Sequence, residues 1–213
     1  MRLHLRASNI GRRAITAIAA TAVAFAMLGT GALAAAPVVH DHISSSSAAA
    51  TNTVCAGTIC TATSVFVIVD SSGGASQACL DITRYDSVAF VVLGYETGCA
   101  PLAPAGFSID TKALANAALS PIDITLQSFT CGASGCVPTG TTRVAQVSAT
   151  YAGIGDTNTF RANSKSTFRG CTMYFVGKGS SRDATATLTV GTESLSGVGS
   201  LFTSTQKAKV LCH

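Results

Sequence analysis

The chain has 213 residues, a formal charge of +4 and eight cysteines; 47% of its residues are hydrophobic and 11% are charged. This apolar composition excludes an intrinsically disordered chain. The absence of a strict glycine period and the scarcity of Glu and Lys exclude collagen-like and coiled-coil architectures, which leaves one domain with a core, or two small ones.

Residues 1–34 have the three parts of an export signal. Four arginines precede an apolar stretch from about residue 14 to residue 28, and Ala32-Leu33-Ala34 fits the rule for signal peptidase cleavage. We expect cleavage after Ala34, because the apolar stretch is short for a membrane span and is interrupted by Thr and Gly. The Arg12-Arg13 pair matches the twin-arginine signal only in part, so both that route and general secretion stay open.

Removal of this segment changes the charge of the product. Four of the fourteen basic residues lie within it and all ten acidic residues lie after it, so the mature chain is formally neutral. No second stretch reaches membrane-spanning length, and we expect the product to be secreted, either extracellular or loosely associated with the cell envelope.

The segment 35–53 is rich in Ser and Ala and is predicted to be a flexible linker. The domain is then expected to cover residues 54–213. Its strands are predicted from alternating apolar residues at 58–70, 77–85, 87–95, 122–131, 143–151, 171–176, 184–190 and 201–211, with turns at 71–74 and 177–181. The alternation is clearest at Val65, Val67 and Val69.

One segment does not fit this pattern. Residues 110–119 contain many helix-forming residues after Asp110, a candidate N-cap, which favours a short helical turn. An edge strand that ends at Pro121 is the alternative. With this segment set aside, the spacing of the strands predicts an all-β fold: a single β-sandwich-like domain of about eight to ten strands, disulfide-stabilised, with little or no helix.

All eight cysteines lie after the export segment. An even number in an exported chain predicts four disulfides, whose connectivity spacing alone does not determine. We favour a bond between Cys131 and Cys136, since the loop between them contains glycines that let the chain bend. Cys212 is expected to fix the C-terminus. The candidates are Cys55, Cys60, Cys79, Cys99, Cys131, Cys136, Cys171 and Cys212.

The sequence does not predict a catalytic, metal or cofactor site. The predicted domain contains no histidine except the terminal His213, which argues against hydrolases with a histidine base. Residues 177–181 fail the spacing of a phosphate-binding loop, so no nucleotide is expected. Paired carboxylates remain the only catalytic candidates, drawn from Asp81, Asp86, Glu96, Asp110, Asp123, Asp156 and Asp183.

Charge is distributed unevenly along the mature chain. Residues 35–142 contain seven acids and two bases, whereas residues 143–213 contain eight bases and three acids. Such asymmetry is typical of an anion-binding face, unless acidic and basic strands interleave and neutralise each other. The candidate residues are Arg161, Lys165, Arg169, Lys178 and Arg182.

We therefore predict a secreted, non-catalytic protein with a binding or surface-association role. Its expected partner is an acidic cell-surface polymer or polysaccharide. Nucleic acid is disfavoured, because export and the lack of interleaved aromatic residues argue against it. Two alternatives stay open: a glycoside hydrolase that uses two carboxylates, and an extracellular protease inhibitor that presents the Cys131–Cys136 loop.

Overall fold

The computed structural model describes residues 39–72, 74–168 and 170–212. The predicted export segment, residues 35–38 and Arg169 lie outside the described residues. The described chain contains nine strands and one short 3-10 helix, η1 (Pro104–Gly106). The strands are β1 (Val39–Ala56), β2 (Ile59–Asp70), β3 (Gln77–Asp86), β4 (Val91–Pro101), β5 (Phe107–Ile109), β6 (Asn116–Gly132), β7 (Gly135–Phe168), β8 (Cys171–Val190) and β9 (Glu193–Cys212).

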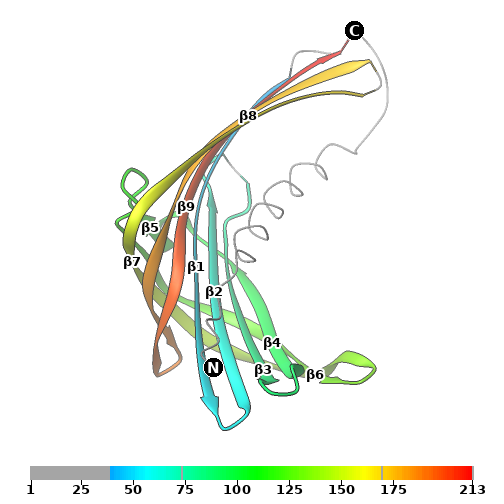
Figure 1. Ribbon diagram of the computed structural model, residues 1–213, viewed down its shortest axis with the longest axis vertical. Coiled ribbons are helices and arrows are strands. Elements are labelled where there is room, and N and C mark those ends of the chain that lie inside the picture. The colour runs from blue at the N-terminus through cyan, green and yellow to red at the C-terminus, as the bar shows by residue number, and fades with distance from the viewer. Residues whose placement is uncertain (1–38, 73, 169, 213) are drawn as a thin grey trace, which may run out of the picture. The chain divides into compact units, whose positions relative to one another are not determined.

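All strands belong to one antiparallel sheet with the order β4-β3-β2-β1-β9-β8-β7-β6-β5. The sheet also closes on itself, because β4 pairs with β6 from Gly94↔Thr130 to Thr97↔Gln127 (Figure 1). The all-β, disulfide-stabilised fold predicted from the sequence is confirmed. The strands form one curled antiparallel sheet that closes through β4 and β6.

The core fills the inside of this closed part. Val65 and Val67 on β2, Leu126 on β6 and Leu188 on β8 are almost completely buried. Their neighbours along each strand point outward, as Phe66 does, so the predicted alternation in β2 is confirmed. Burial of these branched side chains is the main force that holds the walls together.

The closing seam between β4 and β6 requires glycine. A Cβ atom on Gly94 would lie 2.7 Å from the carbonyl oxygen of Phe129, and one on Gly98 would collide with the carbonyl oxygen of Thr125. The rings of Tyr95 and Phe129 stack across the same seam with centroids 4.5 Å apart. Close backbone approach and aromatic stacking therefore close the sheet together.

The prediction of a flexible linker at 35–53 is wrong for its described part. Residues 39–53 lie in β1, which pairs with β2 on one side and β9 on the other. Ala48 and Ala50 are buried in the core. Small side chains suit this central strand because Ala48 lies opposite the bulky, fully buried Leu201. The domain thus includes residues 39–53, whose low-complexity composition had suggested a linker.

Two predicted boundaries also differ. Residues 177–181 do not form a turn, because β8 runs through them from Cys171 to Val190. Residues 87–90 form the turn between β3 and β4 rather than the start of a strand. In that turn the Asp86 carboxylate accepts hydrogen bonds from the backbone N–H groups of Val88 and Ala89, so aspartate favours the turn over a continued strand.

The ambiguous segment 110–119 divides into two parts. The Asp110 carboxylate accepts hydrogen bonds from the N–H groups of Lys112 and Ala113, which produces a turn over residues 111–113. The hydrogen bond from Ala113, and to a smaller extent that from Lys112, lowers the pKa of the Asp110 carboxyl. Leu114 follows with a φ of 49° and is completely buried. From Asn116 onward the chain belongs to β6, so neither sequence-based alternative describes the whole segment.

Three disulfides join directly opposed residues of neighbouring strands: Cys55–Cys60, Cys79–Cys99 and Cys131–Cys136. The predicted Cys131–Cys136 bond is confirmed. Cys171 is also disulfide-bonded, and the strand register places it opposite Cys212. The described residues contain no free cysteine. Such a framework is typical of proteins that fold in an oxidising compartment.

Candidate anion-binding face

Four strands continue beyond the closed part of the sheet and form what we call the extension. It consists of residues 39–46 of β1, 203–212 of β9, 171–181 of β8 and 158–168 of β7. In Figure 1 these strands rise together past the ends of their neighbours. Side chains on the extension, such as those of Arg161 and Lys178, are exposed, whereas one side of the sheet is buried in the closed part.

Strand register defines the two faces of the extension. Ala48 on β1 lies opposite Leu201 on β9, and both side chains point into the core. Because every second residue of a strand lies on the same side of the sheet, Ser44 and Thr205, which are also opposite each other, lie on that side farther along the strands. We call this side the inner face. Thr205 lies opposite Lys178 on β8, and Lys178 lies opposite Arg161 on β7.

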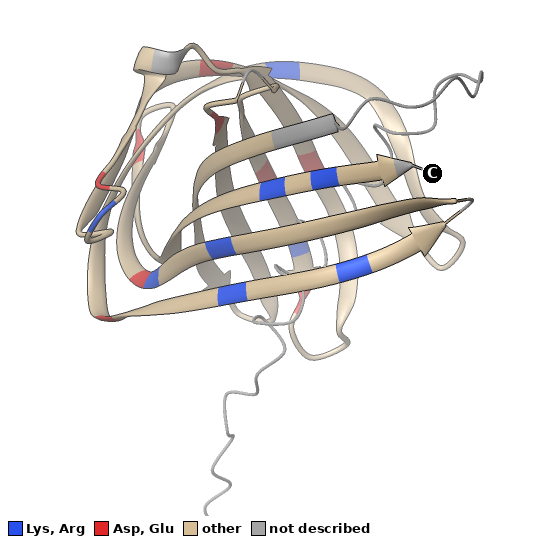
Figure 2. Cartoon of the chain, turned by 90° about the horizontal axis from the view of Figure 1, so that it is seen from above, with Lys and Arg blue, Asp and Glu red and all other residues tan. Residues whose placement is uncertain are grey.

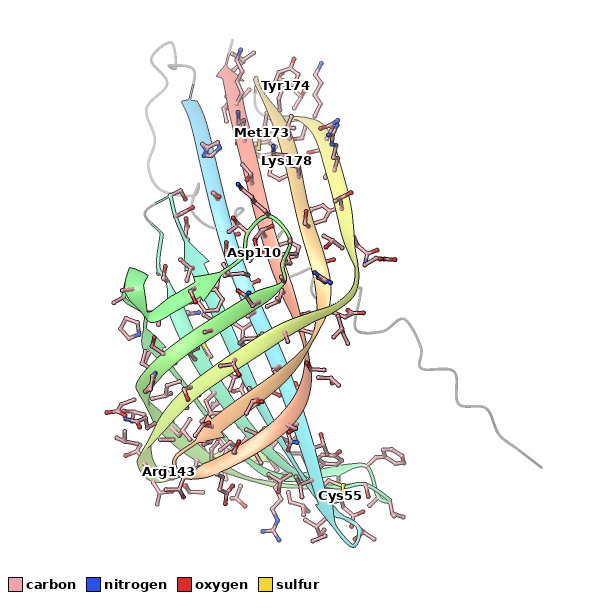
Figure 3. All side chains as sticks on the ribbon, turned by 90° about the vertical axis from the view of Figure 1, so that its left-hand side faces the viewer. Cys55, Asp110, Arg143, Met173, Tyr174 and Lys178 are labelled. Atoms are coloured by element: carbon pink, nitrogen blue, oxygen red, sulfur yellow. A yellow bond between two sulfur atoms is a disulfide. The ribbon has the colours of Figure 1, made fainter. Side chains whose placement is uncertain are left out.

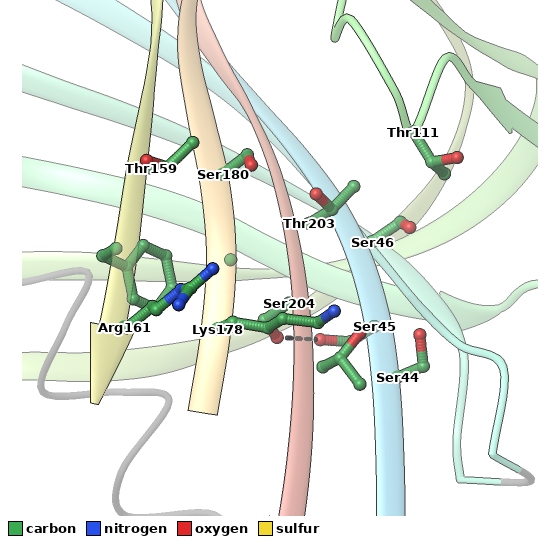
Figure 4. Close-up of a pocket in the computed structure, with 13 residues that line it drawn as sticks. Ser44, Ser45, Ser46, Thr111, Thr159, Arg161, Lys178, Ser180, Thr203 and Ser204 are labelled. Atoms are coloured by element: carbon green, nitrogen blue, oxygen red, sulfur yellow. Dashed lines mark hydrogen bonds between the residues drawn. The ribbon is translucent and has the colours of Figure 1, made fainter. Parts of the chain in front are cut away.

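A hollow of about 520 Å³ lies where the inner face meets the closed part (Figure 4). Hydroxyl groups line much of it, including those of Ser44, Ser46, Thr203 and Ser180, and Thr111 contributes from the loop after β5. Arg161 and Lys178 supply its positive charge. Hydroxyls and cationic nitrogens are hydrogen-bond donors, which is the chemistry needed to hold anionic oxygens.

Further cations follow along the same inner face. Lys207 lies opposite Val176, and Lys209 and Lys165 flank Tyr174 across the strands. The Lys165 ammonium is 5.5 Å from the centre of the Tyr174 ring, which orients it on this face. Figure 2 shows several Lys and Arg positions, in blue, on neighbouring strands near the C-terminus, and Figure 3 shows Tyr174 and Lys178 on the extension.

The inner-face positions of the extension carry no acidic residue in the part of the chain that the structure describes. Within that part, the ion pair that forms is Arg143–Glu96, at the other end of the sheet, and none involves Arg161 or Lys178. The alternative that acidic and basic strands neutralise each other therefore does not describe this face.

The five predicted anion-binding residues are not all equivalent. Arg161, Lys165 and Lys178 share the inner face of the extension, whereas Arg169 lies outside the described residues. Arg182 holds the backbone instead. Its Nε donates to the carbonyl oxygen of Gly155 and its Nη1 to that of Ala113, each at 3.0 Å.

Lys207 and Lys209 were not among the residues predicted from the sequence. Their signal is the alternation Gln206-Lys207-Ala208-Lys209, which places two cations on one side of a strand. The alternation does not reveal which strands lie beside it. Only the register of β9 with β8 brings these lysines to the face that carries Lys178.

Five of the candidate catalytic carboxylates have hydrogen-bond partners of their own in separate parts of the sheet, whereas Asp183 lies opposite Ile154, two residues before Asp156. Glu96 is paired with Arg143 and also accepts from Ser128. Asp81 accepts from Thr97, and Asp123 accepts from Gln146. Asp86 and Asp110 cap turns. None of the hydrogen bonds found in residues 39–72, 74–168 and 170–212 joins two carboxyl groups, and these residues contain no cluster of three or more His, Cys, Asp or Glu side chains that would hold a metal.

Tyr151 is the most deeply buried titratable group of the closed part. Its side chain lies in the core, and burial raises its pKa well above the usual range for tyrosine. Its hydroxyl has no hydrogen-bond partner among the described residues. The phenol therefore stays protonated at neutral pH and does not supply a base.

The Cys131–Cys136 loop forms the tip of the β6–β7 hairpin. The residues after Cys131 are exposed up to and beyond Cys136, and Val137 projects into solvent with 57% of its surface exposed. The disulfide joins directly paired residues across the hairpin. The arrangement holds the loop rigidly but places no charged residue within it.

No protein-family model matches the chain, and no curated protein resembles it significantly in sequence. The described residues include no helix of the length and apolar character needed to cross a membrane.

Proposed function

We propose that the protein is exported and binds an anionic extracellular polymer, without catalysis, along the inner face of the extension. The observation that carries this proposal is the pairing of Arg161 with Lys178. Directly opposed side chains of an antiparallel pair have Cβ atoms about 5 Å apart, and like charges there are destabilising. A bound anion relieves that repulsion.

The surroundings support a ligand that carries oxygen anions. Both cations are exposed and border a hollow lined by hydroxyl groups. Lys207 and then Lys209 follow on the same face at steps of two residues, about 6.6 Å each. A row of cations favours a linear ligand with repeated charges over a single small anion. Acidic polysaccharides and phosphate-containing wall polymers have this character.

The proposal is tested with the folded, disulfide-intact chain and a fluorescent polyphosphate of defined length as the probe. We expect binding that weakens as salt is added, because screening reduces attraction between exposed charges. Arg161→Gln and Lys178→Gln should each weaken binding several-fold. Arg84→Gln removes an equal charge from an exposed position on β3, outside the extension, and serves as the matched control.

Equal losses in all three variants would show that net charge alone attracts the probe, and would contradict a specific face. Binding that is indifferent to salt would also contradict the proposal. A set of neutral and acidic polysaccharides then identifies the preferred class of polymer, and hydrolysis of any of them would favour the glycosidase alternative.

A further inference from the structure

Among the described residues, the extension has two edge strands whose backbone is paired on one side only. Beyond the closed part, residues 158–167 of β7 pair with β8 on one side only, and residues 39–43 of β1 pair with β9 on one side only. Among the described residues no strand covers the other side of either segment. Each edge therefore presents a row of backbone N–H and C=O groups.

The β7 edge carries two charged side chains, Arg161 and Lys165, but its backbone lacks the proline and the bulge with which proteins also protect exposed strands. Residues 158–167 contain no proline, and the register with β8 is continuous from Asn158 to Phe168. The irregularity of β7 lies before this stretch, between Ile154 and Asn158. An edge that is long, regular and without proline is a template for another strand.

The two edges are also complementary in direction. The extension has four strands, each antiparallel to the next in the order β1-β9-β8-β7. Because four is an even number, β1 and β7 run in opposite directions. The β1 edge of a second copy placed beside β7 would continue the antiparallel alternation, with both inner faces on the same side of the enlarged sheet.

We propose that copies of this chain associate head to tail, with the β7 edge (158–167) of one copy pairing with the β1 edge (39–43) of the next. Such a contact uses two different surfaces, so it repeats from copy to copy and closes into a ring or continues as a filament. It joins the basic inner faces into one longer surface. The association does not depend on the anion-binding proposal and is tested without any anion.

The first test measures the mass of the full, disulfide-intact chain by sedimentation over a range of concentrations. We expect assemblies in the wild type and a decrease of roughly tenfold in association constant for Ser164→Lys combined with Ser166→Lys, because two lysines added to Arg161 and Lys165 bring four cations onto one edge strand and oppose its pairing. Both serines are exposed on β7. The control is Thr185→Lys with Thr187→Lys, which adds the same charge to exposed positions of β8, a strand paired on both sides.

The second test identifies the contact. Ser164→Cys and Ile43→Cys chains are treated, separately and mixed, with a short thiol-reactive cross-linker. Head-to-tail pairing predicts cross-linked dimers in the mixture and a ladder of larger species when one chain carries both substitutions. Cross-linking of Ser164→Cys with itself would show symmetric β7–β7 pairing and overturn the proposal. A monomeric wild type would overturn it too.

Discussion

Arg143 on β7 and Glu96 on β4 form an ion pair that spans the intervening strand β6, with Nη2 2.5 Å from Oε2 and Nε 3.0 Å from the same oxygen. Glu96 lies beside the seam at which the sheet closes, where it pairs with Ser128 of β6. The ion pair thus connects β7 to the first strand beyond the seam. Figure 3 shows Arg143 at the end of the sheet away from the extension.

This pair predicts a contribution of Glu96 to stability that depends on pH. The hydrogen bond from Arg143 lowers the pKa of Glu96 and raises that of Arg143. A carboxylate with a depressed folded-state pKa stabilises the fold above its unfolded pKa, near 4.3, and this stability is lost as pH falls through the folded value. Glu96→Gln should therefore lower the free energy of unfolding by about 1 kcal/mol at pH 7 and have little effect at pH 2.

Denaturant unfolding at a series of pH values measures this difference. Arg143→Gln should remove the same pH-dependent component, and the double variant should lose little more than either single one. Additive losses in the double variant would show that the two side chains act separately.

The geometry of the seam predicts that two glycine-to-alanine substitutions have very different effects on stability. Gly98→Ala places a Cβ against the carbonyl oxygen of Thr125, so β4 must move away from β6; we expect a loss of about 1–3 kcal/mol. Gly132→Ala meets no atom within 4 Å and should be nearly neutral. Thermal unfolding of the two variants measures the difference, and similar melting temperatures would contradict the seam geometry.

The disulfides differ in the length of chain that they close. The bond Cys79–Cys99 joins residues separated by 20 positions, whereas Cys131–Cys136 joins residues separated by five. The loop-closure model predicts that replacing both cysteines by alanine costs about 3 kcal/mol for the first bond and about 2 kcal/mol for the second. Denaturant unfolding of the two double variants checks this order. Detection of a free thiol in the denatured wild type would contradict the complete pairing on which the comparison depends.

Arg182 tests the difference between a structural and a binding arginine. Lysine keeps the charge but lacks the fork that reaches both carbonyl oxygens, so Arg182→Lys should destabilise the fold by about 1–2 kcal/mol. Hydrogen exchange should become faster at residues 110–115, and polyphosphate affinity should stay close to that of the wild type. A large loss of affinity with unchanged exchange would place Arg182 among the ligand-binding residues instead.

Much of the closed part follows from sequence, because buried side chains alternate visibly in segments such as Val65 and Val67. The role of β1 does not. Its run of Ser and Ala resembles a linker in composition, and only pairing with β2 and β9 reveals that Ala48 and Ala50 need to be small to pack inside. The same limit applies to the candidate site. Arg161 and Lys178 are close enough in the chain to be grouped by inspection, whereas Lys207 joins them only through strand register.

Lys207 and Lys209 therefore provide the clearest test of a face against a single site. A short anion such as tripolyphosphate spans little more than the hollow at Arg161 and Lys178, whereas a long polyphosphate also reaches the next two steps of β9, about 6.6 Å apart. Lys207→Gln with Lys209→Gln should weaken binding of the long probe several-fold and leave that of the short probe nearly unchanged. Arg161→Gln should weaken both. Isothermal titration measures the affinity of each variant for each of the two probes. If the β9 substitutions weakened binding of the short probe as much as that of the long probe, the four cations would form one undivided site rather than an extended face.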